Sequence, residues 1–225
     1  MFGNLSSSVA YRRERLGERL LSAVGRVRRR RNDGCVSLTF DDGPHVGSTD
    51  LVLDALAALD VKATFFCVGR NVRAHPELVR RMVADGHTVG SHSFSHPFVD
   101  DLGQRSVHQE YAAGRRAVEE ALGYPCPLFR PPHGHLRFDT ALLSRVIKLQ
   151  TWLWSVDPED WRPGAISTEI AATAGRAQSG DVVLLHDWVE QPEAPEALDR
   201  SATVDSLPQI VTAVRRRGLE FEPLR

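Results

Sequence analysis

The chain has 225 residues, 42% of them hydrophobic, which is enough for one substantial core. No segment approaches the roughly 20 consecutive apolar residues of a membrane-spanning helix, so we expect no transmembrane segment. The formal net charge of −1 conceals nine arginines within residues 1–32, and the mildly acidic remainder argues against a nucleic-acid-binding core.

Residues 1–32 are predicted to be a basic leader that precedes the domain. Within them, residues 9–31 place Leu16, Leu20 and Leu21 on one face among arginines, which is typical of an amphipathic helix. Such a helix could make weak contact with an anionic membrane surface, or it could pack on the domain. The chain lacks the apolar region of a secretory signal near its start, and its three cysteines have no paired spacing. We therefore expect a cytoplasmic protein.

Residues 33–225 are predicted to form one domain in which strands and helices alternate. Short apolar segments predict seven strands, at residues 35–40, 63–68, 87–91, 128–130, 151–156, 181–186 and 219–223. Helical patterns lie between them, at residues 49–59, 76–85, 107–122, 138–147, 166–177 and 207–217. This alternation indicates an α/β fold with a parallel sheet, and the even spacing favours closure into a barrel.

The first polar cluster follows the first predicted strand, where Asp41 and Asp42 precede Gly43 and Pro44. Adjacent side chains of an extended chain point to opposite faces, so both carboxylates share one site only if the backbone turns, as Gly-Pro allows. One acid could then bind a metal while its neighbour moves a proton. The alternative is an ordinary turn with two solvated acids.

Two histidines, His92 and His96, follow the third predicted strand. On a helical turn, side chains four residues apart face the same way, so both rings could bind one ion, although such a pair could also be surface residues. With Asp42 they complete a set of two histidines and one carboxylate that leaves positions open for water and substrate. We expect one divalent metal ion, most simply zinc, although cobalt, nickel or iron could bind the same ligands.

The fourth predicted strand ends at Arg130, which could hold Asp41 bidentately and keep it ionised, or could form an ordinary surface ion pair. Two prolines follow Arg130 and rigidify the loop. The next free backbone N–H therefore belongs to His133, and it could stabilise an oxyanion.

The sixth predicted strand ends at His186, beside Asp187. A nearby carboxylate would favour the imidazolium form that a general acid needs, although His186 could also be a hydrogen-bonded core residue. Trp161 and Leu184 could form the walls of a small apolar pocket. Because the carboxyl ends of parallel strands form one rim, we expect all these clusters to converge.

The ordered clusters resemble the sequence motifs of the polysaccharide deacetylases, the carbohydrate esterases of family 4 that share the NodB homology domain. The matching segments are residues 39–44, 92–96, 130–134, 157–161 and 184–187, and the similarity extends from about residue 35 to residue 224. The resemblance implies a distorted (β/α)7 barrel. It also implies metal-dependent hydrolysis of the acetamide of N-acetylglucosamine residues in a chitooligosaccharide or related glycan, with release of acetate.

The resemblance implies three sets of residues around the acetamide. The metal ligands would be Asp42, His92 and His96. Asp41 would be the general base, and Arg130 would position it. The backbone N–H of His133 would donate to the oxyanion. His186 would be the general acid, and Asp160 would tune its pKa. The substrate contacts would be Trp161, Leu184, His133 and Pro132.

One residue departs from the family's pattern, because His133 stands where the family usually has Tyr or Phe. The backbone N–H is unchanged, whereas the surface for sugar contact becomes smaller and titratable. An acidic loop at residues 188–205 is expected to shape the sugar subsites. Two other functions are open: deacetylation of a small N-acyl amino sugar or lipid-linked glycan intermediate, and non-catalytic sugar binding.

Overall fold

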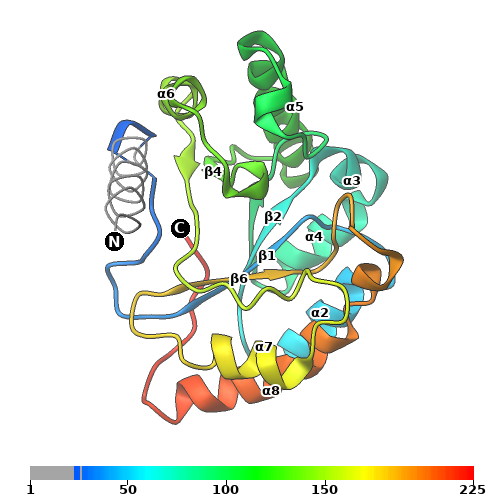
Figure 1. The fold of residues 1–225 in the computed structure, drawn as a ribbon, viewed down its shortest axis with the longest axis vertical. Coiled ribbons are helices and arrows are strands. Elements are labelled where there is room, and N and C mark those ends of the chain that lie inside the picture. The colour runs from blue at the N-terminus through cyan, green and yellow to red at the C-terminus, as the bar shows by residue number, and fades with distance from the viewer. Residues whose placement is uncertain (1–22, 26) are drawn as a thin grey trace, which may run out of the picture.

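The computed structural model describes residues 23–25 and 27–225, so most of the predicted leader helix lies outside the described residues. Within these ranges, parallel strands form one sheet in the order β5-β4-β3-β2-β1-β6 (Figure 1). The strands are β1 (Ser37–Asp41), β2 (Thr64–Cys67), β3 (Thr88–Ser91), β4 (Leu128–Phe129), β5 (Gln150–Thr151) and β6 (Val182–His186).

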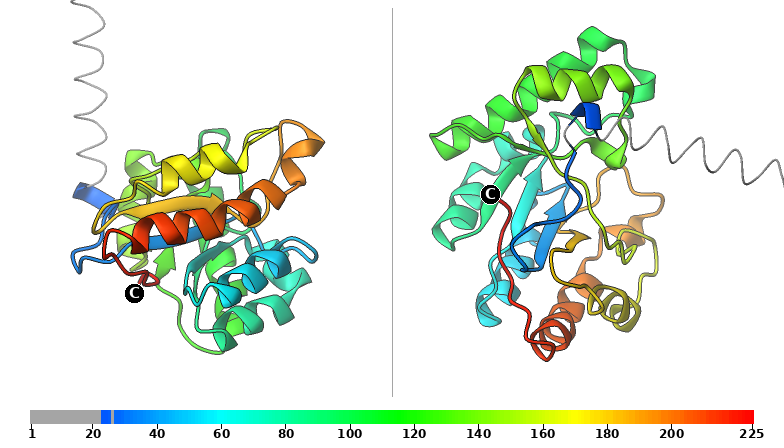
Figure 2. Two further views of the ribbon diagram at one scale, coloured as in Figure 1. Left: turned by 90° about the horizontal axis from the view of Figure 1, so that it is seen from below. Right: turned by 90° about the vertical axis from the view of Figure 1, so that its left-hand side faces the viewer.

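Helices follow the strands and cover the outside of the sheet. They are α2 (Thr49–Ala58), α3 (Gly69–Ala74), α4 (Pro76–Ala84), α5 (Gln104–Leu122), α6 (Phe138–Val146), α7 (Ser167–Ala174) and α8 (Ser201–Arg215). The described part of the chain also contains the short 3-10 turns η1 (Val99–Asp101), η2 (Pro132–Gly134) and η3 (Pro195–Leu198). Helices α7 and α8 pack against each other, and α2 packs beside α8, as the views from two sides show (Figure 2).

The segment after β5 closes the sheet into a barrel. Gln150 and Thr151 pair with β4, whereas Val156 forms a parallel bridge with Val183 of β6, at the other end of the strand order. The backbone N–H of Leu184 donates to the carbonyl of Val156 at 3.0 Å. The expected distorted barrel is therefore confirmed. Its distortion lies between β5 and β6, where the irregular segment that follows β5 connects the two edge strands of the sheet.

The structure differs from the prediction in several elements. The fifth predicted strand, at residues 151–156, is reduced to β5 and the isolated bridge of Val156. The seventh strand, at residues 219–223, is reduced to a single bridge between Phe221 and Val36. Helix α8 begins at Ser201, six residues earlier than expected, and continues through Pro208, which by itself favours a helix start. Helix α3 follows β2 directly and was not predicted from the sequence.

The predicted leader helix is wrong at its C-terminal end, where Arg28 and Arg30 are extended and form bridges with Trp152 and Asp181. The backbone N–H of Arg28 donates to the carbonyl of Thr151 at 2.9 Å. Pairing with the barrel overrides the local helix preference here, as tertiary context commonly does.

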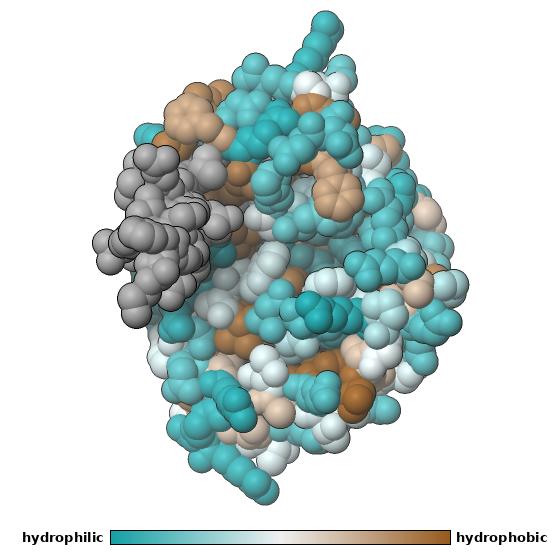
Figure 3. Space-filling view, viewed as in Figure 1, coloured by the Kyte–Doolittle hydropathy of each residue, from teal (hydrophilic) through white to brown (hydrophobic). Residues whose placement is uncertain are grey.

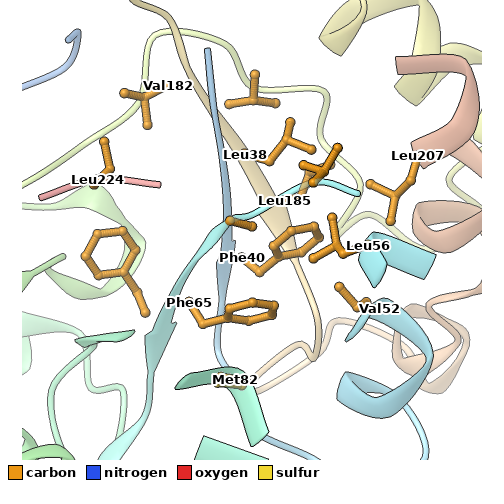
Figure 4. Close-up of a cluster of buried hydrophobic side chains, with 14 of the residues drawn as sticks. Leu38, Phe40, Val52, Leu56, Phe65, Met82, Val182, Leu185, Leu207 and Leu224 are labelled. Carbon is orange, nitrogen blue, oxygen red and sulfur yellow. The ribbon is translucent and has the colours of Figure 1, made fainter. Parts of the chain in front are cut away.

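Strand β1 divides its side chains between two environments because successive residues of a strand point to opposite faces. Leu38 and Phe40 pack outward against α2 and α8, and the ring of Phe40 stacks on Phe65 of β2 with centroids 5.2 Å apart (Figure 4). Full burial of such side chains contributes roughly 1.5–3 kcal/mol each. Thr39 and Asp41 point into the barrel, so the hydrophobic core outside the sheet fixes the position of the polar residues inside it.

The face of the molecule in Figure 3 is predominantly hydrophilic, with hydrophobic side chains in small patches, as expected when apolar residues are concentrated in the core. Among the helices that the structure describes, none combines the length and the apolar composition needed to cross a membrane.

Candidate active site

The predicted clusters converge at the carboxyl edge of the sheet. The strand register places Asp41 opposite His186 on the neighbouring strands β1 and β6. A cavity of about 370 Å³ opens there, and the side chains that line it include Asp41, Asp42, His92, His96, Phe98, His133, Trp154, Trp161, Leu184 and His186. Three of the predicted site residues lie behind its wall: Arg130 under Asp41, Asp160 under His186, and the buried Pro132.

Asp42, His92 and His96 form a candidate divalent metal site. Oδ1 of Asp42 lies 3.4 Å from Nε2 of His92 and 3.3 Å from Nε2 of His96. Ligand atoms at about 2.1 Å from a tetrahedral ion are about 3.4 Å apart, so these separations suit a shared ion. Oδ1 is buried and has no hydrogen-bond partner among the described residues, a need that a cation would satisfy. The residues present therefore fit a metal.

The hydrogen bond of His92 and the neutral imidazole of His96 suit metal binding. The Nδ1–H of His92 donates to the carbonyl of Arg130 at 2.7 Å, which leaves Nε2 as the ligand atom. Burial lowers the pKa of His96 to about 3, so its imidazole is neutral. Burial opposes protonation of His92 as well, but the charges of Asp41 and Asp42 outweigh it and raise the pKa of His92. This corner of the cavity thus attracts positive charge.

The expectation that the histidines share a helical turn is wrong. Residues 92–96 form a loop in which Ser93 and His96 are left-handed, with φ of 64° and 58°. Helix α5 holds the loop from outside: the Glu110 carboxylate accepts two of its backbone N–H groups, at 3.2 and 2.8 Å. A Cβ atom at Gly114 would lie 2.3 Å from the Ser93 carbonyl, so only glycine lets the helix approach. That glycine within a helical pattern was the sequence signal for this contact.

Arg130 fixes one oxygen of Asp41 and leaves the other free. Its Nη1 donates to Oδ1 of Asp41 at 2.6 Å and to the hydroxyl of Thr39 at 2.9 Å, rather than forming the expected bidentate pair. Arg130 is completely buried, and its guanidinium also lies 4.2 Å from the centroid of the Phe66 ring. Oδ2 of Asp41 lies 3.6 Å from Nε2 of His92, on the cavity side.

His186 is held by the carboxylate of Asp160. Its Nδ1 lies 2.7 Å from Oδ1, and its backbone N–H donates to Oδ2 at 2.9 Å. The hydroxyl of Thr203 donates to Oδ2 of Asp160 at 2.8 Å. The guanidinium of Arg200 donates to the backbone carbonyl of Asp160, also at 2.8 Å. Burial alone would lower the pKa of His186, but the charge and hydrogen bond of Asp160 raise it to about 9. The imidazole of His186 is thus protonated at neutral pH.

His133 lies at the mouth of the cavity in a left-handed conformation, with φ of 56°. Its ring stacks in parallel on Phe98, with centroids 3.7 Å apart, and lies 4.4 Å from the ring of His96. Burial lowers the pKa of His133. Phe98 was not among the predicted site residues, although its position two residues after His96 was a signal that it would reach the same rim.

The loop after β6 is joined to the loop after β1 through Asp187. Its carboxylate accepts the backbone N–H of Gly43 at 3.2 Å and the hydroxyl of Thr49 at 2.5 Å, and burial raises its pKa to about 7. A Cβ atom at Gly43 would lie 1.9 Å from Oδ2 of Asp187, so glycine is required there. Residues 189–193 of the same loop line the cavity.

Comparisons with known proteins agree with this geometry. A family model described as polysaccharide deacetylase matches residues 28–152. The chain is 38% identical over 205 residues to a chitooligosaccharide deacetylase from Bradyrhizobium sp. (strain ANU 289), which covers 87% of this chain and 94% of the relative. It is 32% identical to a peptidoglycan-N-acetylglucosamine deacetylase from Bacillus cereus, over 84% of this chain and 86% of the relative. A family 4 carbohydrate esterase from Streptomyces lividans, solved in complex with acetate, has a TM-score of 0.75 and 34% identity, with 84% and 92% of the two chains covered.

Proposed function

The chain belongs to the polysaccharide deacetylase family, as its ordered motifs predicted, and we propose that it is a metal-dependent N-deacetylase of N-acetylglucosamine residues in a chitooligosaccharide or related glycan. One observation carries this proposal. A carboxylate, Asp41, and a protonated imidazole, His186, face the same cavity beside the Asp42, His92 and His96 set. Hydrolysis of an amide requires such a base and acid on one substrate.

The metal is proposed to be zinc, because two imidazole nitrogens and one carboxylate oxygen form a common zinc ligand set. Cobalt, nickel or iron would fit the same ligands. When bound, the ion supplies a Lewis acid that polarises the acetamide carbonyl and lowers the pKa of water.

Asp41 is proposed to act as the general base. Arg130 donates to Oδ1 of Asp41 and to the hydroxyl of Thr39, while Oδ2 of Asp41 faces the cavity. A water molecule between Oδ2 and the acetamide carbon would lose its proton to Asp41 as it attacks. The backbone N–H of His133, at the rim, would donate to the oxyanion that develops on the carbonyl oxygen.

His186 is proposed to act as the general acid. Its raised pKa keeps it protonated at neutral pH, and it would give its proton to the amine as the C–N bond breaks and acetate leaves. Trp161 and Leu184 line the same cavity and would enclose the acetyl methyl group. Pro132, which is buried, would contribute through the shape of the loop rather than by direct contact.

The named relatives support more than one glycan, because both chitooligosaccharide and peptidoglycan deacetylases are similar to this chain. The alternative substrate is a small N-acyl amino sugar or a lipid-linked glycan intermediate, and the basic residues 1–32 would favour the latter by weak contact with an anionic membrane. We propose a cytoplasmic location, which the free thiols of Cys35, Cys67 and Cys126 support. Non-catalytic sugar binding is disfavoured because the chain has a suitable residue at each position where the family's motifs place a metal ligand, a general base or a general acid.

Acetate release measured side by side from chitotetraose, a peptidoglycan fragment and monomeric N-acetylglucosamine, with and without a chelator, tests the proposal. We expect chitotetraose to release the most acetate, and we expect the chelator to abolish this release. Greatest release from the monomer would favour the small-substrate alternative. Sugar binding without release of acetate from any of them would favour the non-catalytic function.

A further inference from the structure

Two residues outside the predicted clusters, Asn71 of α3 and Glu190 of the loop after β6, contact the carbonyl and Oδ2 of Asp42, respectively, and not the oxygen that faces the histidines. We propose that they are positioning residues that present only Oδ1 of Asp42 to the metal and thereby set the affinity of the site. The inference rests on the proposed function, since it concerns the metal site of that reaction.

The hydrogen bonds distinguish the two carboxylate oxygens of Asp42. The backbone N–H of Glu190 donates to Oδ2 at 2.8 Å, whereas Oδ1 has no hydrogen-bond partner among the described residues and faces both histidines. An oxygen that already accepts a charge-assisted hydrogen bond is a poorer ligand than one that accepts none. The contact therefore favours monodentate binding through Oδ1.

The backbone of Asp42 is held by Asn71, which is in turn held by the side chain of Glu190. Nδ2 of Asn71 donates to the carbonyl of Asp42 at 2.8 Å and to Oε1 of Glu190 at 2.7 Å. Asp42 has φ of 77°, a left-handed conformation that is unfavourable for a residue other than glycine and persists only where the surroundings enforce it. Asn71 and Glu190 supply part of that enforcement.

The sheet order explains why these two residues reach Asp42. Strand β1 lies between β2 and β6, α3 follows β2, and Glu190 follows β6, so the two side chains meet above the end of β1. Figure 1 shows the orange segment after β6 beside α3. Glu190 is nearly buried, with 6% of its side chain exposed, and the half-exposed Arg70 pairs with its carboxylate.

Loss of a residue that orients a metal ligand typically weakens metal affinity about 10- to 100-fold. We expect Asn71→Ala to raise the Kd for Zn²⁺ by such a factor, because it removes both hydrogen bonds that Nδ2 donates, to Asp42 and to Glu190. Glu190→Ala should do the same by releasing the loop from Asn71 and Arg70. Glu190→Gln keeps an oxygen that accepts from Asn71, so it should rescue most of the affinity.

The Kd for Zn²⁺ is measured on the full chain by competition with a chromophoric chelator, together with the thermal midpoint of the metal-free protein. Activity is then titrated with Zn²⁺. Since the three ligands are unchanged, the variants should need more Zn²⁺ for half-maximal activity but approach the wild-type kcat at saturation. Glu196→Ala, an exposed position in the same loop, is the matched control and should leave the Kd unchanged.

A Kd for Zn²⁺ in Asn71→Ala and Glu190→Ala equal to that of the wild type would overturn the inference, and so would a lowered thermal midpoint with unchanged Kd. A wild-type protein that binds no Zn²⁺ would instead overturn the metal site of the proposed function. The two failures are thus distinguishable.

Discussion

Nδ1 of His186 lies 2.7 Å from Oδ1 of Asp160, and this contact decides the charge of the imidazole. Burial would lower the pKa of His186, yet Asp160 raises it from 6.5 to about 9. A raised pKa in the folded state stabilises the protein fully below the unfolded value. That contribution to the free energy of unfolding is therefore complete below about pH 6.5 and is lost as the pH rises through about 9.

The pair predicts how the rate depends on pH. In the wild type, kcat should fall as His186 loses its proton near pH 9. Asp160→Asn removes the charge that raises the pKa, so the alkaline limit of kcat should move to lower pH. The measurement is kcat against pH for both proteins, with Asp205→Asn, an exposed position on α8, as the control. An alkaline limit that does not move in Asp160→Asn would show that Asp160 does not tune His186.

Because Asp41 is not one of the proposed metal ligands, we expect its substitution to lower turnover without loss of bound metal. Asp41→Asn should lower kcat by roughly 10²- to 10⁴-fold, since it removes a general base. Metal content should be unchanged, because Asp42, His92 and His96 are intact. Both are measured on the same preparation, kcat by acetate release and metal by elemental analysis. Near-normal turnover in this variant would exclude Asp41 as the base.

The burial of Arg130 predicts a large effect on stability. Its side chain is 0% exposed and that of Asp41 is 4% exposed, so Arg130→Met leaves a buried carboxylate without its partner. We expect the free energy of unfolding to fall by about 3–5 kcal/mol. The double variant Arg130→Met with Asp41→Asn should recover part of this loss. Urea denaturation of the four proteins provides the cycle, and simple additivity of the two single changes would contradict the coupling.

His133 predicts an effect on substrate affinity rather than on the chemical step. His133→Phe keeps the backbone N–H and the stack on Phe98 while enlarging the apolar surface. We expect kcat to be maintained and the KM for chitotetraose to fall by about two- to tenfold, which corresponds to roughly 0.5–1.5 kcal/mol of aromatic contact. Steady-state kinetics measures both. A large loss of kcat would mean that the imidazole itself takes part in the reaction.

The barrel and the convergence of the motifs were predictable because they depend on local patterns. Apolar segments such as that ending at Asp41 alternate with helical ones, and parallel strands bring their carboxyl ends to one rim. Asp41 and His186 could thus be expected to meet, although they are 145 residues apart in the sequence.

The rest of the site depends on contacts that leave little local signal. The sequence could not show that Glu190 would contact Asn71, because the two are 119 residues apart and belong to no common motif. The helical turn expected for His92 and His96 failed because left-handed residues other than glycine are set by tertiary contacts, here with Glu110 and Gly114 of α5.

The proposed metal site is tested most directly by a titration of chelator-treated protein with Zn²⁺, in which bound metal and acetate release from chitotetraose are followed together. We predict that both rise in parallel and saturate at one ion per chain in the wild type, and that His96→Ala requires far more Zn²⁺. Acetate release that is complete before Zn²⁺ is added, or metal binding that is unchanged in His96→Ala, would contradict the proposed site.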